Sequence, residues 1–167
     1  MRVVDDLRAN AIANLVVGDI GLLAAAIRAD HPGRAVALFA LVNIALAIVW
    51  GGPGPAGRLR KEALRASSPP GGRALEPVSV TRRRVCVALI PAVAVLAVLV
   101  GVAPEVAAVL AGVPAGIGAG ELWLLGWARR FQREHREELL REVPPSPFTR
   151  GERAVYTLPM NAVTDAT

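Results

Sequence analysis

Long apolar stretches separated by short polar connections dominate the chain. Four such stretches cover residues 9–27, 35–50, 85–103 and 106–128. A helix that crosses a lipid bilayer needs about 20 mostly apolar residues. Residues 85–103 contain no ionisable side chain except Cys86, whereas a helix of a soluble bundle would carry charges at helical period. The pattern therefore predicts four membrane-spanning helices rather than buried helices of a soluble domain.

The short connections pair these helices. Pro32 and Gly33 interrupt helix within residues 28–34, and Pro104 stands where the fourth helix should begin. Proline suits the first turn of a helix because its missing N–H needs no partner there. Tight connections make consecutive helices antiparallel neighbours. We therefore predict an all-α fold, an integral membrane four-helix bundle made of two antiparallel helical hairpins.

The remaining segments complete the expected organisation. Residues 1–50 form the first hairpin and residues 85–128 the second. Residues 51–84 read as a flexible basic loop because they are rich in Gly, Pro and Ser, with one short helix expected near 57–65. Residues 129–167 should hold a helix over 129–143, supported by Arg/Glu pairs at four-residue spacing, followed by a disordered tail.

Positive charge is concentrated at particular connections and predicts the orientation. Of the 19 Lys and Arg, 17 precede the first stretch, lie in the central loop or follow the fourth stretch. Short loops rich in Lys and Arg stay in the cytoplasm. Trp50, Trp123 and Trp127 fall at the same predicted side, and tryptophan favours the headgroup level. We expect a multi-pass protein of the cell membrane with both termini in the cytoplasm.

The overall composition fits this assignment. The chain is 53% hydrophobic, with a formal charge of +5 and a mean hydropathy of +0.44. A basic chain can bind nucleic acid, but here few aromatic side chains that could stack on bases lie among the basic residues. Arginines beside a membrane meet anionic lipid headgroups, at about 1 kcal/mol per residue. The expected partner is therefore an anionic bilayer surface and not nucleic acid.

Asp19 is the clearest polar residue inside a predicted span. It lies ten positions before Ala29 at the turn, which places it about 15 Å into the bilayer at about 1.5 Å per residue. Asp19 and Asn43 are each 12 positions from His31, so a straight hairpin would bring them to one depth. Two hypotheses follow: a hydrogen-bonded clamp between the two helices, or a proton or cation site.

A second polar contact is expected nearer the cytoplasmic end. Asn10, Asn14 and Gly18 repeat every four residues and form one small, polar face of the first helix. Glu121 in the fourth helix lies at a depth similar to that of Asn14. A Glu121–Asn14 contact would join the first and fourth helices. The same face could instead line a water-accessible cleft or serve helix packing.

Small residues and prolines mark the second hairpin. Ala108, Gly112, Gly116 and Gly120 recur every four residues, which favours close approach of another helix, within the chain or from a second copy. Pro91 and Pro114 lie at matching depths, 12 and 11 positions from Ala103. Each removes a backbone hydrogen bond, and the pair could act as hinges or as adjustments of packing.

No pattern for catalysis, cofactor binding or metal binding stands out. The chain has no Walker loop, no Gly-x-Ser-x-Gly and no His-Glu-x-x-His. Its single cysteine, Cys86, excludes an internal disulfide and a cysteine-rich metal site, and its two histidines, His31 and His135, lie outside the spans on opposite sides. We therefore expect no catalytic residues, no cofactor and no metal.

Two functional hypotheses remain. The first is a non-enzymatic accessory or assembly subunit, in a homodimer or a larger membrane complex. The second is a small dimeric transporter or channel, coupled to protons or cations through Asp19. The two differ in whether Asp19 titrates or only bonds to a neighbouring helix.

Overall fold

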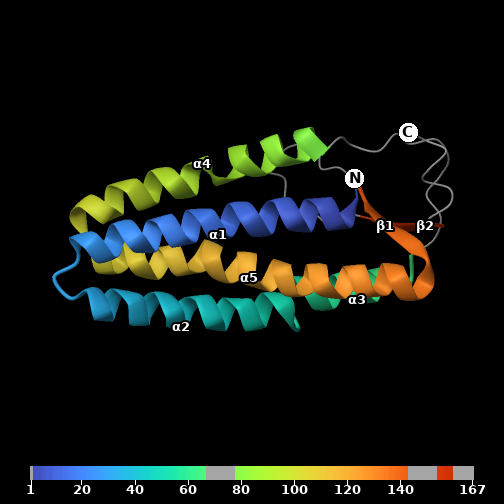
Figure 1. Cartoon of the computed structure of the whole chain (residues 1–167), viewed down its shortest axis with the longest axis horizontal. Coiled ribbons are helices and arrows are strands. Elements are labelled where there is room, and N and C mark those ends of the chain that lie inside the picture. The colour runs from blue at the N-terminus through green and yellow to red at the C-terminus, as the bar shows by residue number, and fades with distance from the viewer. Residues whose placement is uncertain (1, 67–77, 143–153, 160–167) are drawn as a thin grey trace.

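The computed structural model describes residues 2–66, 78–142 and 154–159. Four long helices lie side by side, and a short helix and a two-stranded sheet cover one end of them (Figure 1). In chain order the elements are α1 (Val3–Arg28), α2 (Pro32–Gly51), α3 (Pro55–Ala63), α4 (Val78–Val102), α5 (Pro104–His135), β1 (Glu137–Arg141) and β2 (Val155–Pro159). The protein is thus mostly helical, as predicted, and α2 and α5 both begin at the prolines that the sequence indicated.

Helix α5 is the centre of the assembly. In its most apolar window 61% of the residues are buried, against 28% in α1, 17% in α2 and 11% in α4. It packs along both α1 and α2, while α4 packs mainly on α1 (Figure 1). Because α5 lies against two neighbours, two of its faces must admit close contact.

The glycine ladder of α5 faces α2. A Cβ atom built at Gly112 would lie 2.9 Å from the carbonyl oxygen of Phe39, and one at Gly116 would lie 2.7 Å from that of Asn43. At Gly120 a Cβ would come within 2.7 Å of the Cβ of Trp50. All three positions therefore need glycine, and the partner of this ladder is a helix of the same chain.

A second set of small residues on α5 faces α1. A Cβ at Gly18 would lie 2.6 Å from the Cβ of Ala115 and 2.8 Å from the carbonyl oxygen of Ala111. At Gly118 a Cβ would lie 2.8 Å from the carbonyl oxygen of Ala11. Small side chains on both faces let the three backbones come close. Helices in a lipid bilayer associate through such close packing, because the hydrophobic effect does not favour helix contact over lipid contact there.

This arrangement corrects the expected hairpin geometry. Helices α1 and α2 are consecutive, but each packs chiefly on α5 and much less on the other. A turn of only Ala29, Asp30 and His31 fixes their antiparallel direction without making them close along their length. The tight turn therefore predicted the direction of the helices correctly and their contacts incorrectly.

The end of the bundle that holds the N-terminus has a compact apolar core. Its buried side chains come from α1, α3, α5 and both strands, and include Val3, Leu59, Phe131, Leu139 and Val155. Helix α3 belongs to this core, so this part of the expected flexible loop is packed. Helix α3 begins and ends two residues before the short helix predicted near 57–65.

Helix α3 is also held by one arginine. The Nη2 atom of Arg60 donates a hydrogen bond to the carbonyl oxygen of Gly51 at 3.2 Å, at the end of α2. Its guanidinium carbon lies 5.7 Å from the centre of the Trp127 ring, a distance typical of a cation–π contact. Arg60 thus joins α2, α3 and α5.

Three segments differ from the predicted secondary structure. The expected helix over 129–143 ends at His135, because Arg136 adopts a left-handed conformation with φ 55° and ψ 32°, which ends helices. The next residues form β1, which pairs antiparallel with β2, with Leu139 opposite Thr157. Residues 155–159 of the expected tail are therefore a strand. Helix α4 begins at Val78, so the last part of the predicted loop is helical.

The outer surface of the long helices is strongly apolar. Ile20 and Leu23 are each 62% exposed, Leu41 67% and Val98 65%. Exposed apolar surface of this extent marks contact with a membrane or another protein. The four long helices are also long and apolar enough to cross a membrane, and the outward side chains suit lipid.

Replacing one glycine of the ladder tests the packing of α5. We expect Gly116→Ala to lower the free energy of unfolding of the detergent-solubilised protein by about 1–3 kcal/mol, because the new methyl group meets backbone atoms of α2. Gly126→Ala is the matched control, since a Cβ at Gly126 has no atom within 4 Å. The control should be neutral or up to about 1 kcal/mol stabilising. Equal melting temperatures for the two variants would contradict the described packing.

Candidate functional site

A polar cavity lies at the end of the bundle that holds the N-terminus. It has a volume of about 230 Å³. Two carboxyl and two guanidinium groups line it together with apolar side chains: Asp6, Leu7, Asn10, Trp50, Pro55, Arg84, Val85, Ala88, Glu121, Leu124 and Arg141. These residues come from six elements of the fold, so the cavity exists only where those elements meet.

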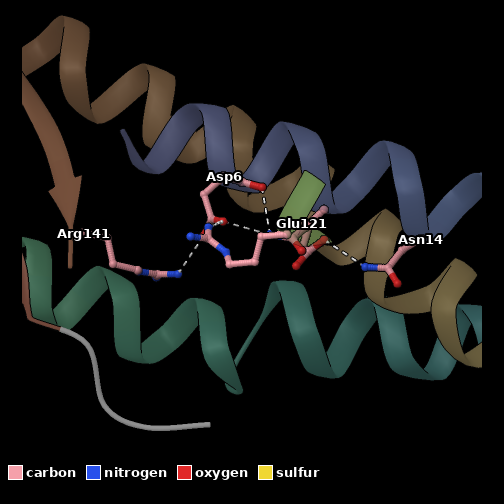
Figure 2. A network of polar contacts seen from close by, with 6 residues as sticks. Asp6, Asn14, Glu121 and Arg141 are labelled. Carbon is pink, nitrogen blue, oxygen red and sulfur yellow. Dashed lines mark hydrogen bonds and ion pairs between the residues drawn. The ribbon is translucent and has the colours of Figure 1, made fainter. Parts of the chain in front are cut away.

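Asp6 is the centre of this polar cluster. Its side chain is only 4% exposed, because it lies in the first turns of α1 between α4 and β1. Its Oδ1 atom accepts hydrogen bonds from Nη2 of Arg84 and from Nδ2 of Asn10, both at 3.2 Å. Its Oδ2 atom lies 3.6 Å from Nη1 of Arg141. Figure 2 shows Asp6 and Arg141 pointing toward one another.

The two arginines belong to segments far apart in the sequence. Arg84 is on α4 and Arg141 is the last residue of β1, and their side chains are 12% and 20% exposed. Both ion pairs are thus largely screened from water by protein, where removing one partner leaves an uncompensated charge. Asp6 therefore ties α1 to α4 and to the strand that follows α5.

The predicted contact between Asn14 and Glu121 is present. The Nδ2 atom of Asn14 donates a hydrogen bond to Oε2 of Glu121 at 3.5 Å, and the two side chains face each other from α1 and α5 in Figure 2. Both residues are buried, at 8% and 9% exposure. This bond joins α1 and α5 at the inner edge of the polar cavity, as the depth argument indicated.

A further ion pair fastens the start of the chain to the sheet. The Nε atom of Arg2 lies 3.0 Å from Oε1 of Glu138, and Arg2 also forms a backbone bridge with Leu140. Burial raises the pKa of Glu138, and the charge of Arg2 opposes that rise. The pair closes the end of the bundle beside the Asp6 cluster.

The other predicted polar pair is not brought together. Asp19 is exposed on α1 and Asn43 is half-buried on α2. In the part of the chain that the structure describes, Asp19 has neither a hydrogen bond nor an ion pair. Helix α5 separates the two residues, since Gly18 packs on Ala115 while Gly116 packs on Asn43. The proposed clamp between the first two helices is therefore absent.

The predicted hinge prolines also have unlike environments. Pro91 is exposed on α4, whereas Pro114 is buried in α5. Both helices continue through their prolines.

The sequence did not predict Asp6, Arg84 and Arg141 as partners. Each is a charged residue flanking a predicted span, and charge count and position along the chain carry no information on pairing. One signal was present: Asp6 and Asn10 stand two turns and one turn before Asn14 on the same side of α1, so the polar face extends to an acidic residue.

The cluster offers no evident centre for metal chemistry. Within residues 2–66, 78–142 and 154–159, no three His, Cys, Asp or Glu side chains are grouped so that they could hold a metal ion. Cys86 is a free, exposed thiol on α4. The arrangement of paired carboxyl, guanidinium and amide groups fastens helices and leaves a small polar space between them.

Comparison with known proteins adds no family assignment. The chain matches no protein-family model, no curated protein and no solved structure.

Removing the central carboxylate should loosen the end of the bundle. We expect Asp6→Ala to destabilise the detergent-solubilised protein by about 3–5 kcal/mol, because two largely buried guanidinium groups lose their counter-charge. Thermal unfolding followed by circular dichroism measures the change. Asp5→Ala is the control, since it removes the same charge from the neighbouring position without breaking the described ion pairs. Similar losses for the two variants would contradict the role assigned to Asp6.

The contact of Glu121 can be tested by two substitutions. We expect Glu121→Gln to be nearly neutral, because the new amide oxygen can still accept the hydrogen bond of Asn14. Glu121→Leu should destabilise by about 1–3 kcal/mol, since the buried Asn14 amide then loses its partner. The same unfolding measurement applies, and a leucine variant as stable as the glutamine variant would show that the hydrogen bond is unimportant.

Proposed function

We propose that this protein is a non-enzymatic accessory subunit of a membrane complex, and that α1 contacts a partner helix around Asp19. The observation that carries this proposal is the position of Asp19. It is exposed on a helix that is long and apolar enough to cross a membrane, and its own chain provides it with no partner among the described residues.

Exposure of this carboxyl to lipid would be costly. Ionisable side chains within transmembrane helices almost always face a bundle interior or a water-filled cavity, or pair with one another. Asp19 does not line the polar cavity at the end of the bundle that holds the N-terminus. A neighbouring polypeptide that donates a hydrogen bond would satisfy it, as side chains of adjacent transmembrane helices do.

The surroundings of Asp19 support a helix-binding surface. Ile20, Leu23 and Ile27 are 62%, 62% and 75% exposed on the same half of α1. These apolar side chains would pack against a partner helix while Asp19 supplies the polar contact. The glycine ladder of α5 is covered by α2, so the proposed interface with the partner does not include it.

The proposed orientation places the arginine-rich end in the cytoplasm. Arg2, Arg84 and Arg141 meet at the end of the bundle that holds the N-terminus and the sheet. Loops rich in Lys and Arg remain in the cytoplasm. With four crossings, both termini would then be cytoplasmic, and the side chains of Asp19 and Ile27 would lie in the middle and outer parts of the cell membrane.

The integrity of the complex in native membranes tests the proposal. In blue-native electrophoresis after mild detergent extraction, we expect the wild type and Asp19→Asn to migrate as a complex larger than the monomer. Asp19→Leu should weaken the complex by about threefold or more, because interhelical hydrogen bonds in membranes average about 0.6 kcal/mol. Asp30→Leu is the control, since it makes the same change in the turn after α1.

Two results would contradict the proposal. A wild type that migrates only as a monomer would show that no complex forms. An Asp19→Leu variant with an unchanged complex would show that Asp19 does not contribute to it. The alternative function, a proton- or cation-coupled carrier, requires the carboxyl group of Asp19 to titrate. It would be favoured if the purified protein moved ions across liposomes and Asp19→Asn abolished that flux.

A further inference from the structure

A second cavity runs along the surface between α1 and α4. Its volume is about 600 Å³, within the range of about 300–1,000 Å³ found for small-molecule sites. From α1 its walls are formed by Ala9, Ile12, Ala13 and Val16, and from α4 by Val85 and Cys86. The two alanines leave room that larger side chains would fill, so the loose contact between these helices produces a groove.

One end of this groove is positively charged. Arg8 from α1 and Arg82 from α4 line it, and both are exposed. Neither guanidinium has a hydrogen bond or an ion pair within the described part of the chain. Asp5 also lines this end, so the groove carries two guanidinium groups and one carboxylate. A guanidinium pair of this kind suits the oxygens of a phosphate group.

The other end of the groove is apolar. Ile12 and Val16 are 51% and 49% exposed, and at about 1.5 Å per residue Val16 lies about 12 Å beyond Arg8 along the helix. A ligand that fills the groove must therefore carry an anionic group at one end and an apolar chain longer than about 10 Å. A phospholipid has this form, and basic pockets between membrane helices bind anionic lipid headgroups.

We propose that the groove between α1 and α4 binds one anionic phospholipid, whose phosphate contacts Arg8 and Arg82 and whose acyl chain lies on Ile12 and Val16. The contrast with Arg84 supports this assignment. Arg84 is on the same turn of α4 but is bonded to Asp6 inside the bundle, whereas Arg82 faces the groove. The site does not depend on the proposed partner surface, which lies in the other half of α1.

Native mass spectrometry of the full chain in detergent tests the site. The probes are phosphatidylglycerol, phosphatidylcholine with the same acyl chains, and inorganic phosphate. We expect one phosphatidylglycerol to stay bound where phosphatidylcholine and inorganic phosphate do not. Arg8→Gln with Arg82→Gln should weaken retention by about fivefold for each arginine removed. Arg83→Gln with Arg129→Gln is the control, because it removes the same charge from two exposed arginines outside the groove.

A second variant tests the apolar part of the site with both arginines intact. Ala9→Leu with Ala13→Leu should fill the groove and also reduce phosphatidylglycerol retention. Melting temperatures of all variants establish that each is folded. Equal retention of the two phospholipids would overturn the proposal, as would equal losses in the groove and control arginine variants. Retention of inorganic phosphate as strong as that of phosphatidylglycerol would overturn the assigned lipid.

Discussion

The close approach of α5 to two other helices is the constraint on which the structure depends. Glycines at 112, 116 and 120 admit the backbone of α2, and Gly18 of α1 admits Ala115 on another face of α5. In a membrane, burial of apolar side chains does not distinguish helix contact from lipid contact, so van der Waals packing between backbones must supply the difference. Larger side chains at these positions would separate the helices and remove that gain.

The polar cluster at one end depends on this packing. Only when α5 lies on α1 do Asn14 and Glu121 meet, and only when α4 and β1 cover the start of α1 does Asp6 meet Arg84 and Arg141. The short helix α3 and the sheet enclose a compact apolar core beside it. Apolar side chains of this end face inward, whereas many of those along the long helices face outward.

Two contacts were predicted from the depth of polar residues in the membrane, and only one of them forms. The Asn14–Glu121 contact and the Asp19–Asn43 clamp came from the same calculation, which uses rise per residue to give position along the bundle. The first is present and the second is not, because α5 separates α1 from α2. Rise per residue fixes depth, but the direction of each side chain around the helix axis depends on which helices are neighbours.

The sequence by itself determined that four long apolar helices exist, where two of them begin, and that small residues on the fourth would admit a neighbour, because these features follow from local hydropathy, proline and side-chain size. Only the tertiary structure decided that α2 is the neighbour of the glycine ladder, that Asp6 pairs with arginines from α4 and β1, and that Asp19 faces outward. It also showed that the chain after Arg136 forms a strand. Each of these results depends on contacts between residues far apart in the chain, which local patterns do not encode.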